Sequence, residues 1–464
     1  FKAGLKAGGE GSRERTVEAG RRGISYLVRA RALDRLGSFA SAVVTSTKDP
    51  RLLGRVIAEL AGVVEQVPAG QARWSLRTYL ADALMQAGRP EAALPFYEQA
   101  VAEAEMAESW SDVGWICQNW AVALVMVGRL AEAKSTYLRG ATGDGRAGSP
   151  RVDVLGSELE ALRVDVMQGE AERALPEVES RLAKVRAWWR RRGAGEAVPE
   201  APDPVLLARV LIAGLDIARQ ATLALERWDA CLGLLTESEE TQRAMGEGAH
   251  SLTRTRFNRY KPLLQLGRLH EAQDVLESCL AVFRGMGDLG REAATLSALA
   301  DLWDTRGERE QAAGLARQGL AVRNRLSDLA GRAISHGNLA NYLARPGTEE
   351  EAARHRLAAI AYFLVIGHAQ HLAPTLRSLA IAMRQAAAAG GRYELPRLAE
   401  LLARPEFEPL RRTLTEWKVP LDELQWRSTS MWRRCGGGWR RGRLRGRKAD
   451  PGMRLPVWQS SARR

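Results

Sequence analysis

The chain has 464 residues, of which 45% are hydrophobic and 27% are charged, a composition typical of folded proteins and too apolar for disorder throughout. Its length favours two or three domains, or one elongated array, over a single compact core. Most of the net charge of +13 lies at one end, because residues 426–464 carry twelve Lys or Arg and one acid, a net of +11. The remaining +2 gives no reason to expect a polyanion as partner of the folded body.

Cysteine usage and hydropathy indicate the cellular compartment in which the protein is expected. The four cysteines show no paired spacing of the kind found in zinc sites or disulfide frameworks, which favours a reducing environment. No uninterrupted apolar stretch, 120–127 included, approaches the roughly 18 to 20 residues that span a bilayer, and no signal peptide opens the chain. We therefore expect a cytoplasmic protein without a membrane partner.

A repeat of about 40 residues runs through the chain. In each unit a glycine is followed five residues later by a small residue, and neighbouring glycines are 40 or 41 residues apart except across one gap of 98. Glu226 and Cys231 take the two positions inside that gap, and the excess that remains falls in a Gly- and Pro-rich inserted loop at 190–204. Gly37 and Ala42 suggest a divergent eighth unit. The regular pairs are Gly88/Ala93, Gly128/Ala133, Gly169/Ala174, Gly267/Ala272, Gly307/Ala312 and Gly347/Ala352.

The repeat predicts two antiparallel helices that meet at a tight turn. Upstream of most of these glycines, an apolar residue lies four positions before the glycine and a small residue seven before it, as in Leu84 and Ala81, which places both on one helical face. The glycine can adopt the left-handed conformation that ends the first helix. The small residue after it lets the second helix approach closely. One unit cannot bury its apolar face alone, so neighbouring units must stack.

These residues resemble the tetratricopeptide repeat family over about residues 73–360. The spacing of 40 to 41 exceeds the family's usual 34 and is similar to the long-repeat subtype of kinesin light chain and many bacterial regulatory proteins. The resemblance implies an all-α fold, a right-handed α-solenoid of helix-turn-helix repeats. Leu162 and Tyr260 replace the small residue of the first helix, and Arg181 and Arg356 occupy later positions of the second, so we expect units three to five to pack less regularly.

Four regions follow from this pattern. Residues 1–70 form a divergent helical repeat region, 71–360 the solenoid of about seven repeats, and 361–425 a helical capping region. The segment 426–464 combines Trp with Arg and Gly and loses all amphipathic periodicity. A nucleic-acid arm would use such residues for phosphate neutralisation and base stacking. We favour the interpretation that a frameshift or assembly error produced this tail, because misread GC-rich DNA yields Arg, Gly and Trp.

The candidate binding residues lie on the first helices, which the resemblance assigns to the concave surface that binds peptides. Nine residues before the glycine, three units carry an asparagine: Asn119, Asn258 and Asn338. An amide can pair with both the N–H and the C=O of a bound backbone. Asparagines at this position resemble a peptide-backbone ladder in the long-repeat subtype. Weaker candidates nearby are Asn341, Arg254 and Lys261.

Other apparent chemical motifs lack the context that they need. The stretch 143–148 matches a dinucleotide fingerprint by letter, but no strand precedes it. His368 and His371 share a helical face, yet no third metal ligand is evident. Cys231 and Cys279 stand at small-residue positions of the repeat and are expected in the core. We therefore expect no cofactor, no metal and no small-molecule substrate.

The leading hypothesis is a non-enzymatic scaffold or receptor that holds a polypeptide in the groove of the repeats. A second hypothesis is the sensor or regulatory region of a larger signalling enzyme, an ATPase or a caspase-like protease, whose remainder precedes Phe1. Nucleic-acid binding through the basic tail ranks third.

Overall fold

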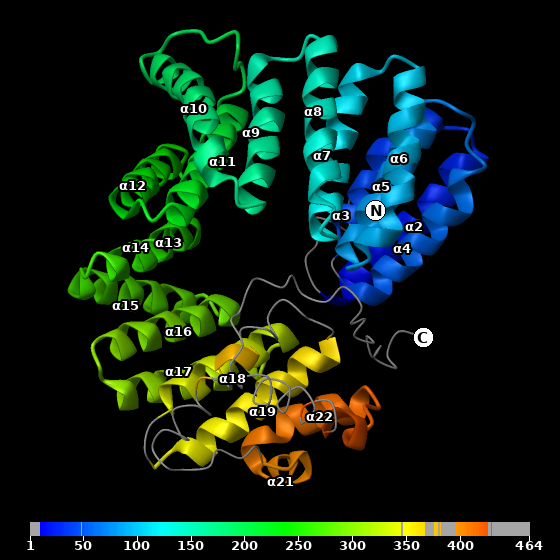
Figure 1. Cartoon of the computed structure of the whole chain (residues 1–464). Coiled ribbons are helices and arrows are strands. Elements are labelled where there is room, and N and C mark those ends of the chain that lie inside the picture. Colours follow the sequence, from blue (N-terminus) through cyan, green and yellow to red (C-terminus); the bar gives the residue numbers. More distant parts are fainter. Residues whose placement is uncertain are drawn as a thin grey trace, which may run out of the picture. The chain divides into compact units, whose positions relative to one another are not determined.

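The computed structural model describes residues 10–47, 49–344, 347–366, 375–378, 381, 396–425 and 428, and every regular element within these ranges is a helix. Within each compact unit of the chain, most successive helices run in opposite directions and pack side by side (Figure 1). The chain divides into two compact units, residues 1–247 (unit 1) and 248–464 (unit 2). The all-α fold of tandem helix-turn-helix repeats is therefore confirmed, whereas the four regional boundaries predicted above remain predictions.

Unit 1 consists of helix pairs in which each first helix is followed by its antiparallel second helix. The first helices of consecutive pairs are α3, α5, α7, α9 and α11, and α2 precedes them. The bounds are α2 Glu10–Arg29, η1 Leu33–Arg35, α3 Leu36–Thr45, α4 Pro50–Val64, α5 Gln71–Gln86, α6 Pro90–Met106, α7 Trp110–Met126, α8 Leu130–Arg146, α9 Arg151–Met167, α10 Ala171–Gly193, α11 Pro204–Ala224 and α12 Trp228–Ala244.

Unit 2 continues the same alternation, with α15, α17 and α19 as its second helices. The bounds are α13 Ala249–Phe257, α14 Tyr260–Gln265, α15 Leu269–Gly285, α16 Leu289–Thr305, α17 Arg309–Arg323, α18 Leu329–Tyr342, α19 Glu349–Ile366, α21 Leu398–Leu402, η2 Pro405–Phe407 and α22 Glu408–Glu416. The last three elements share a core with α19, which includes Leu401 and Phe407.

The predicted turns form as expected. All six glycines of the repeat have positive φ, from 70° at Gly88 to 92° at Gly347. At the first turn the Arg89 N–H donates to the Leu84 carbonyl at 2.9 Å, which closes a Schellman motif after α5. Glu226 has a φ of 56°, so a residue with a Cβ adopts the same left-handed turn at the position that the repeat assigns to it. The sequence register therefore locates the turn even where glycine is absent.

The predicted eighth unit at Gly37 and Ala42 is wrong. Both residues lie inside α3, and neither precedes a turn. The pair α3/α4 turns further along the chain, where the Asp49 side chain accepts the Arg51 N–H at 2.8 Å and Pro50 begins α4. An N-cap aspartate followed by proline starts this helix, a signal unrelated to the glycine of the other units.

The inserted loop is shorter than the predicted 190–204. The basic stretch 190–193 continues α10, and the irregular segment covers only residues 194–203. Val198 and Ala201 of this segment are buried, and the Val152 N–H donates to the Glu200 carbonyl at 3.0 Å. The insertion thus packs onto the start of α9 and belongs to the core of unit 1.

The first helix of the Gly267 unit is interrupted. Residues 258 and 259 separate α13 from α14. Pro262 lacks an N–H, so the Asn258 carbonyl cannot receive the helical hydrogen bond from four residues further on. This break agrees with the irregular packing that the sequence predicts around Tyr260.

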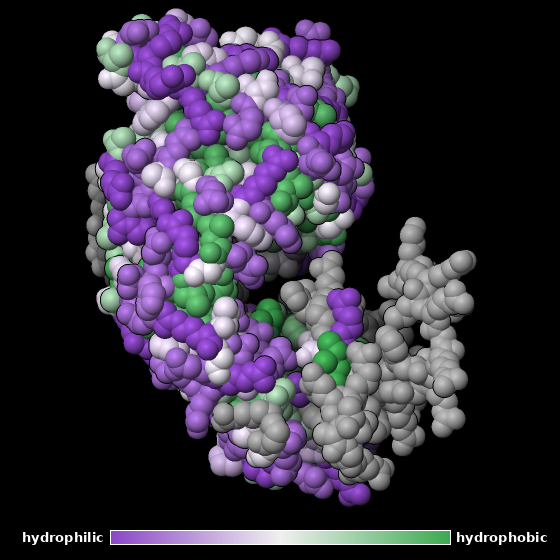
Figure 2. All heavy atoms as spheres, turned by 60° about the vertical axis from the view of Figure 1, so that its left-hand side comes forward, coloured by the Kyte–Doolittle hydropathy of each residue, from purple (hydrophilic) through white to green (hydrophobic). Residues whose placement is uncertain are grey.

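Hydrophobic residues are mostly directed inward. On the face shown in Figure 2 they lie in narrow patches among hydrophilic residues. The small residues of the repeat, such as Ala93, Ala133 and Cys231, are completely buried. Among the described helices none is both long enough and apolar enough to span a membrane.

A close approach of two helix backbones that favours glycine joins α7 and α8. A Cβ at Gly143 would lie 3.0 Å from the Trp110 carbonyl oxygen and 3.1 Å from the Gly114 nitrogen, both of them backbone atoms. Gly145, on the same helix, has open space at this position. The backbones of α7 and α8 therefore approach each other across Gly143.

We expect Gly143→Ala to lower the free energy of unfolding by about 1–3 kcal/mol, because the added methyl forces the two backbones apart. The control Gly145→Ala should leave stability unchanged or raise it by up to about 1 kcal/mol, since alanine favours the helix. Urea unfolding followed by circular dichroism measures both. Equal stability of the two variants would contradict the close approach.

Candidate functional site

A groove follows α5 on the side that faces α3 and α7. It consists of two adjoining cavities of about 390 and 520 Å³, which share the side chains of Tyr79 and Trp115. We call it the α5 groove. It is lined by the first helices of three consecutive pairs and by two further residues, Leu33 of η1 and Tyr97 of α6. The surface that the repeat predicts for binding is thus hollowed in unit 1.

Helical periodicity places the lining residues on one face of each helix. On α5 the residues Tyr79, Asp82 and Gln86 follow one another at three and four positions, while Leu80 and Leu84 on the other face are buried in the core. Trp115, Asn119 and Val122 have the same relation on α7. The amphipathic pattern of the repeat therefore gives the groove a row of side chains from each first helix.

Two aromatic rings stand at the middle of the groove. The ring centroids of Tyr79 and Trp115 are 5.6 Å apart with an interplanar angle of 54°. Both side chains are half-buried, so part of each ring faces the open space. Burial raises the pKa of Tyr79, which keeps its hydroxyl protonated at neutral pH. The pair offers apolar ring faces together with one hydroxyl group.

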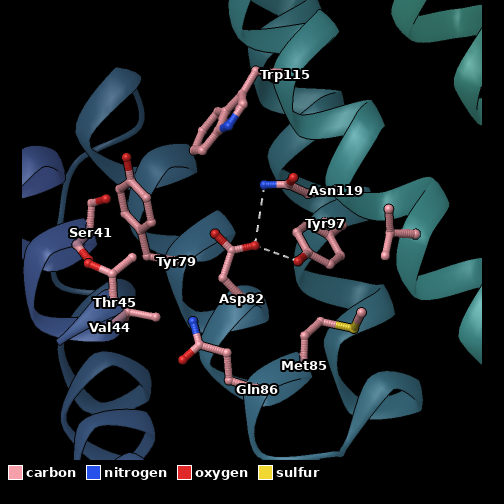
Figure 3. Close-up of a pocket in the computed structure, with 11 residues that line it drawn as sticks. Ser41, Val44, Thr45, Tyr79, Asp82, Met85, Gln86, Tyr97, Trp115 and Asn119 are labelled. Atoms are coloured by element: carbon pink, nitrogen blue, oxygen red, sulfur yellow. Dashed lines mark hydrogen bonds between the residues drawn. The ribbon is translucent and has the colours of Figure 1, made fainter. Parts of the chain in front are cut away.

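A half-buried carboxylate lies beside these rings. Asp82 Oδ1 accepts the Tyr97 hydroxyl at 2.6 Å and the Asn119 Nδ2 group at 3.4 Å (Figure 3). Burial raises the pKa of Asp82 to about 6, and the hydrogen bond from Tyr97 opposes this rise. Among the residues that the structure describes, none forms an ion pair with Asp82.

A second carboxylate lies in the adjoining cavity. Asp112 accepts hydrogen bonds from Ser109 Oγ at 2.7 Å, Trp74 Nε1 at 3.1 Å and Gln71 Nε2 at 3.3 Å. Within the part of the chain that the structure describes, no Lys or Arg lines either cavity. With both carboxylates ionised, the α5 groove carries negative charge at neutral pH.

Of the predicted site residues, Asn119 is the one that lies in the α5 groove. Its amide nitrogen is directed at Asp82, so the carbonyl oxygen is the group it can offer to a ligand. The other five predicted residues belong to unit 2.

Unit 2 brings two of those five together. Asn338 and Asn341 of α18 line a cavity of about 170 Å³ with the buried side chain of Arg356. Asn341 Oδ1 accepts the Ser378 hydroxyl at 2.6 Å. The remaining three lie on or beside the interrupted helix: Asn258 is half-buried after α13, and Arg254 and Lys261 are exposed.

Sequence reasoning did not name Tyr79, Asp82 or Trp115 as site residues. Tyr79 stands nine residues before Gly88, the same repeat position as Asn119 before Gly128. The search for a repeated asparagine therefore overlooked the residue that holds the corresponding place in the preceding unit. Position within the repeat, rather than residue type, is the signal that finds the groove.

The motifs set aside on sequence grounds have structural roles where they are described. Gly143 packs against α7, so the stretch 143–148 is a helix and its end rather than a phosphate-binding loop. Cys231 and Cys279 are buried, as predicted. No cluster of potential metal ligands occurs in the described ranges, and His368 and His371 lie outside them.

The fold has counterparts among solved structures. A tetratricopeptide repeat protein from Parabacteroides merdae is 12% identical and covers 66% of this chain and 98% of its own, with a TM-score of 0.42. The quorum sensor NprR from B. thuringiensis is 11% identical, with coverages of 80% and 99% and a TM-score of 0.42. A signal transduction ATPase with a tetratricopeptide repeat sensor from Pyrococcus horikoshii is 14% identical, with coverages of 85% and 53% and a TM-score of 0.42. No family model and no curated protein matches the chain.

The chain's own geometry defines its class. Antiparallel helix pairs, a left-handed residue at each predicted turn and buried small residues five positions later recur in one register. The chain is therefore a tetratricopeptide-like helical repeat protein with the long spacing of 40 to 41 residues.

The carboxyl of Asp82 makes stability depend on pH. Its folded-state pKa of about 6 exceeds the ordinary 3.8, so the folded state holds the proton more tightly, and the free energy of unfolding decreases as pH rises from about 4 to about 6. Asp82→Asn removes this dependence. We expect the free energy of unfolding of the variant, relative to that of the wild type, to be about 1–3 kcal/mol greater at pH 7 than at pH 4. Urea unfolding at both pH values measures this difference. A difference that does not change with pH would contradict the raised pKa.

Proposed function

We propose that this chain is a non-enzymatic scaffold or receptor whose α5 groove holds a segment of another polypeptide. The observation that carries the proposal is the groove itself, which follows a first helix and combines aromatic faces with hydrogen-bonding groups. Peptide-binding surfaces typically join a few aromatic anchors to polar groups that fix the guest. Support also comes from the three free cysteines of the described ranges, which are buried thiols suited to a reducing compartment such as the cytoplasm.

The length of the groove suits an extended segment. Its lining on α5 extends from Gln71 to Gln86, which is the whole of this 16-residue helix. At 1.5 Å per residue the helix is ~24 Å long. An extended chain rises ~3.3 Å per residue, so about seven residues of a guest fit along it. This number is enough for several backbone hydrogen bonds.

The polar side chains can pair with a guest backbone. The Asn119 carbonyl oxygen accepts, the Gln86 amide donates and accepts, and the hydroxyls of Ser41 and Thr45 do both. Such pairing holds a backbone with little dependence on its sequence. In unit 2, Asn338 and Asn341 place amide groups at a second cavity. We assign to these two amides the same role of pairing with a guest backbone.

Trp115→Ala tests the groove. We expect a library of random 12-residue peptides, panned on the immobilised full chain, to yield binders whose affinity drops at least about 30-fold in this variant, because a buried aromatic anchor contributes about 2 kcal/mol or more. Met126→Ala is the control, since Met126 is exposed on the same helix but does not line the groove. Fluorescence anisotropy of labelled peptides gives the affinities. Binders that do not distinguish Trp115→Ala from Met126→Ala would place the site elsewhere.

Asn258→Ala and Asn338→Ala test the predicted asparagine ladder in unit 2. Each loses a donor and an acceptor for a guest backbone, so we expect partner binding to weaken about 5- to 30-fold, in line with one or two hydrogen bonds of about 1 kcal/mol each. Helical circular dichroism and the melting temperature should not change. Unaltered affinity in both variants would remove unit 2 from the binding surface.

A further inference from the structure

We propose that the α5 groove selects a guest with an arginine side chain, which stacks on Tyr79 and Trp115 and pairs with the Asp82 carboxylate. This inference rests on the proposed function and narrows it from any polypeptide to a cationic one. Three features support it: the free oxygen of Asp82, the contrast between Asp82 and Asp301, and the aromatic pair.

One oxygen of the carboxylate is available to a ligand. Both hydrogen bonds that described residues donate to Asp82 go to Oδ1, from Tyr97 and Asn119. The other oxygen points toward the Tyr79 side of the groove (Figure 3). Tyr97 and Asn119 therefore fix the orientation of the carboxylate without neutralising its charge. A half-buried, oriented carboxylate favours a cationic hydrogen-bond donor over a neutral one.

The repeat supplies an internal comparison. Asp301 stands six residues before Gly307, as Asp82 stands six before Gly88, and it too accepts a tyrosine hydroxyl, from Tyr342. Burial raises the pKa of Asp301, while the hydrogen bond from Tyr342 and the positive charge of Lys261 lower it. Asp301 thus has a cation within its own chain.

Among the residues that the structure describes, none supplies a cation at the corresponding place beside Asp82. Lys261 comes from the first helix of the pair that precedes Asp301. The first helix that precedes Asp82 is α3, which contributes only Ser41, Val44 and Thr45 to this cavity. All three are uncharged. A guest's guanidinium can therefore supply to Asp82 the positive charge that Lys261 supplies to Asp301.

The aromatic pair favours arginine among cations. A guanidinium is planar, so it stacks on a ring while its N–H groups donate to the free carboxylate oxygen, whereas a compact ammonium does not stack in this way. The chain uses this contact elsewhere, where Arg146 lies 4.4 Å from the centroid of Trp110 and Arg306 lies 4.7 Å from that of Trp303. Asp112 in the adjoining cavity adds negative charge and disfavours acidic guests.

Of the described residues that line this cavity, Asp82 is the one that titrates between pH 5 and pH 7.5. The other titratable groups of the lining are Tyr79 and Tyr97, whose pKa values burial raises above the ordinary 10.0. The residues from α3 and α7 that line it are not titratable. Binding of an arginine guest should therefore weaken as pH falls through about 6, where Asp82 takes up a proton.

The test compares arginine with citrulline, its neutral analogue of nearly the same shape. Peptides selected on the full chain as above are expected to share an arginine, and its replacement by citrulline should weaken binding at pH 7.5 at least about 10-fold, the loss of one charge-assisted pair. Asp82→Asn should remove the difference between the two peptides. Asp301→Asn is the matched control, because it alters a carboxylate outside the groove that likewise accepts a tyrosine hydroxyl, and it should preserve the difference.

The outcomes separate this inference from the proposed function. Peptides that depend on Trp115 but bind equally with citrulline would overturn the selection of arginine and leave the peptide groove in place. A citrulline effect that persists in Asp82→Asn would also overturn it. The wild-type pH profile tests the same point without a variant: an affinity for the arginine peptide that is constant from pH 7.5 to pH 5 contradicts the role of Asp82. If no peptide binds at all, both proposals fail.

Discussion

The tight turn between antiparallel helices is the constraint on which the rest of this structure depends. A left-handed residue ends the first helix, and its neighbour's N–H reaches back to the carbonyl five residues earlier, as Arg89 does to Leu84. The chain therefore reverses at a fixed point in each unit. Because the helices on both sides keep the helical period, a given distance from the turn corresponds to one face in every unit. Core, groove and helix contacts all follow from that register.

The turns could be predicted because they leave a local signal, and the failures occurred where that signal was absent or misleading. Glu226 was found by counting although it is not glycine, whereas Gly37 proved to be a helical residue of α3. The basic stretch 190–193 looked like part of a loop but continues α10, whose residue Trp188 packs into the core and extends the helix beyond its local breakers. The interruption after α13 follows from Pro262, which has no N–H to donate to the Asn258 carbonyl. This missing hydrogen bond matters only because Pro262 lies in a helix, and the proline alone does not show that.

The sequence indicated where the candidate groove lies better than it indicated which residues line it. The first helices do form a groove, and Asn119 lies in it, but its neighbours Tyr79, Asp82 and Trp115 were not expected. The repeated asparagine was a misleading signal, because the position that holds Asn119 in one unit holds Tyr79 in the preceding unit. The raised pKa of Asp82 depends on burial by three helices, and no pattern within a single helix contains that information.

The position six residues before each turn has a wider consequence. It holds a different side chain in nearly every unit, and none of them is buried: Asp82, Val122, Arg163, Gln220, Lys261, Asp301 and Asn341. Since these side chains lie at the edge of the core rather than in it, their chemistry can be exchanged while the buried residues that stack the helices stay the same. An engineer could therefore rewrite the charge of one pair at a time and obtain arrays with chosen ligand preferences on an unchanged backbone.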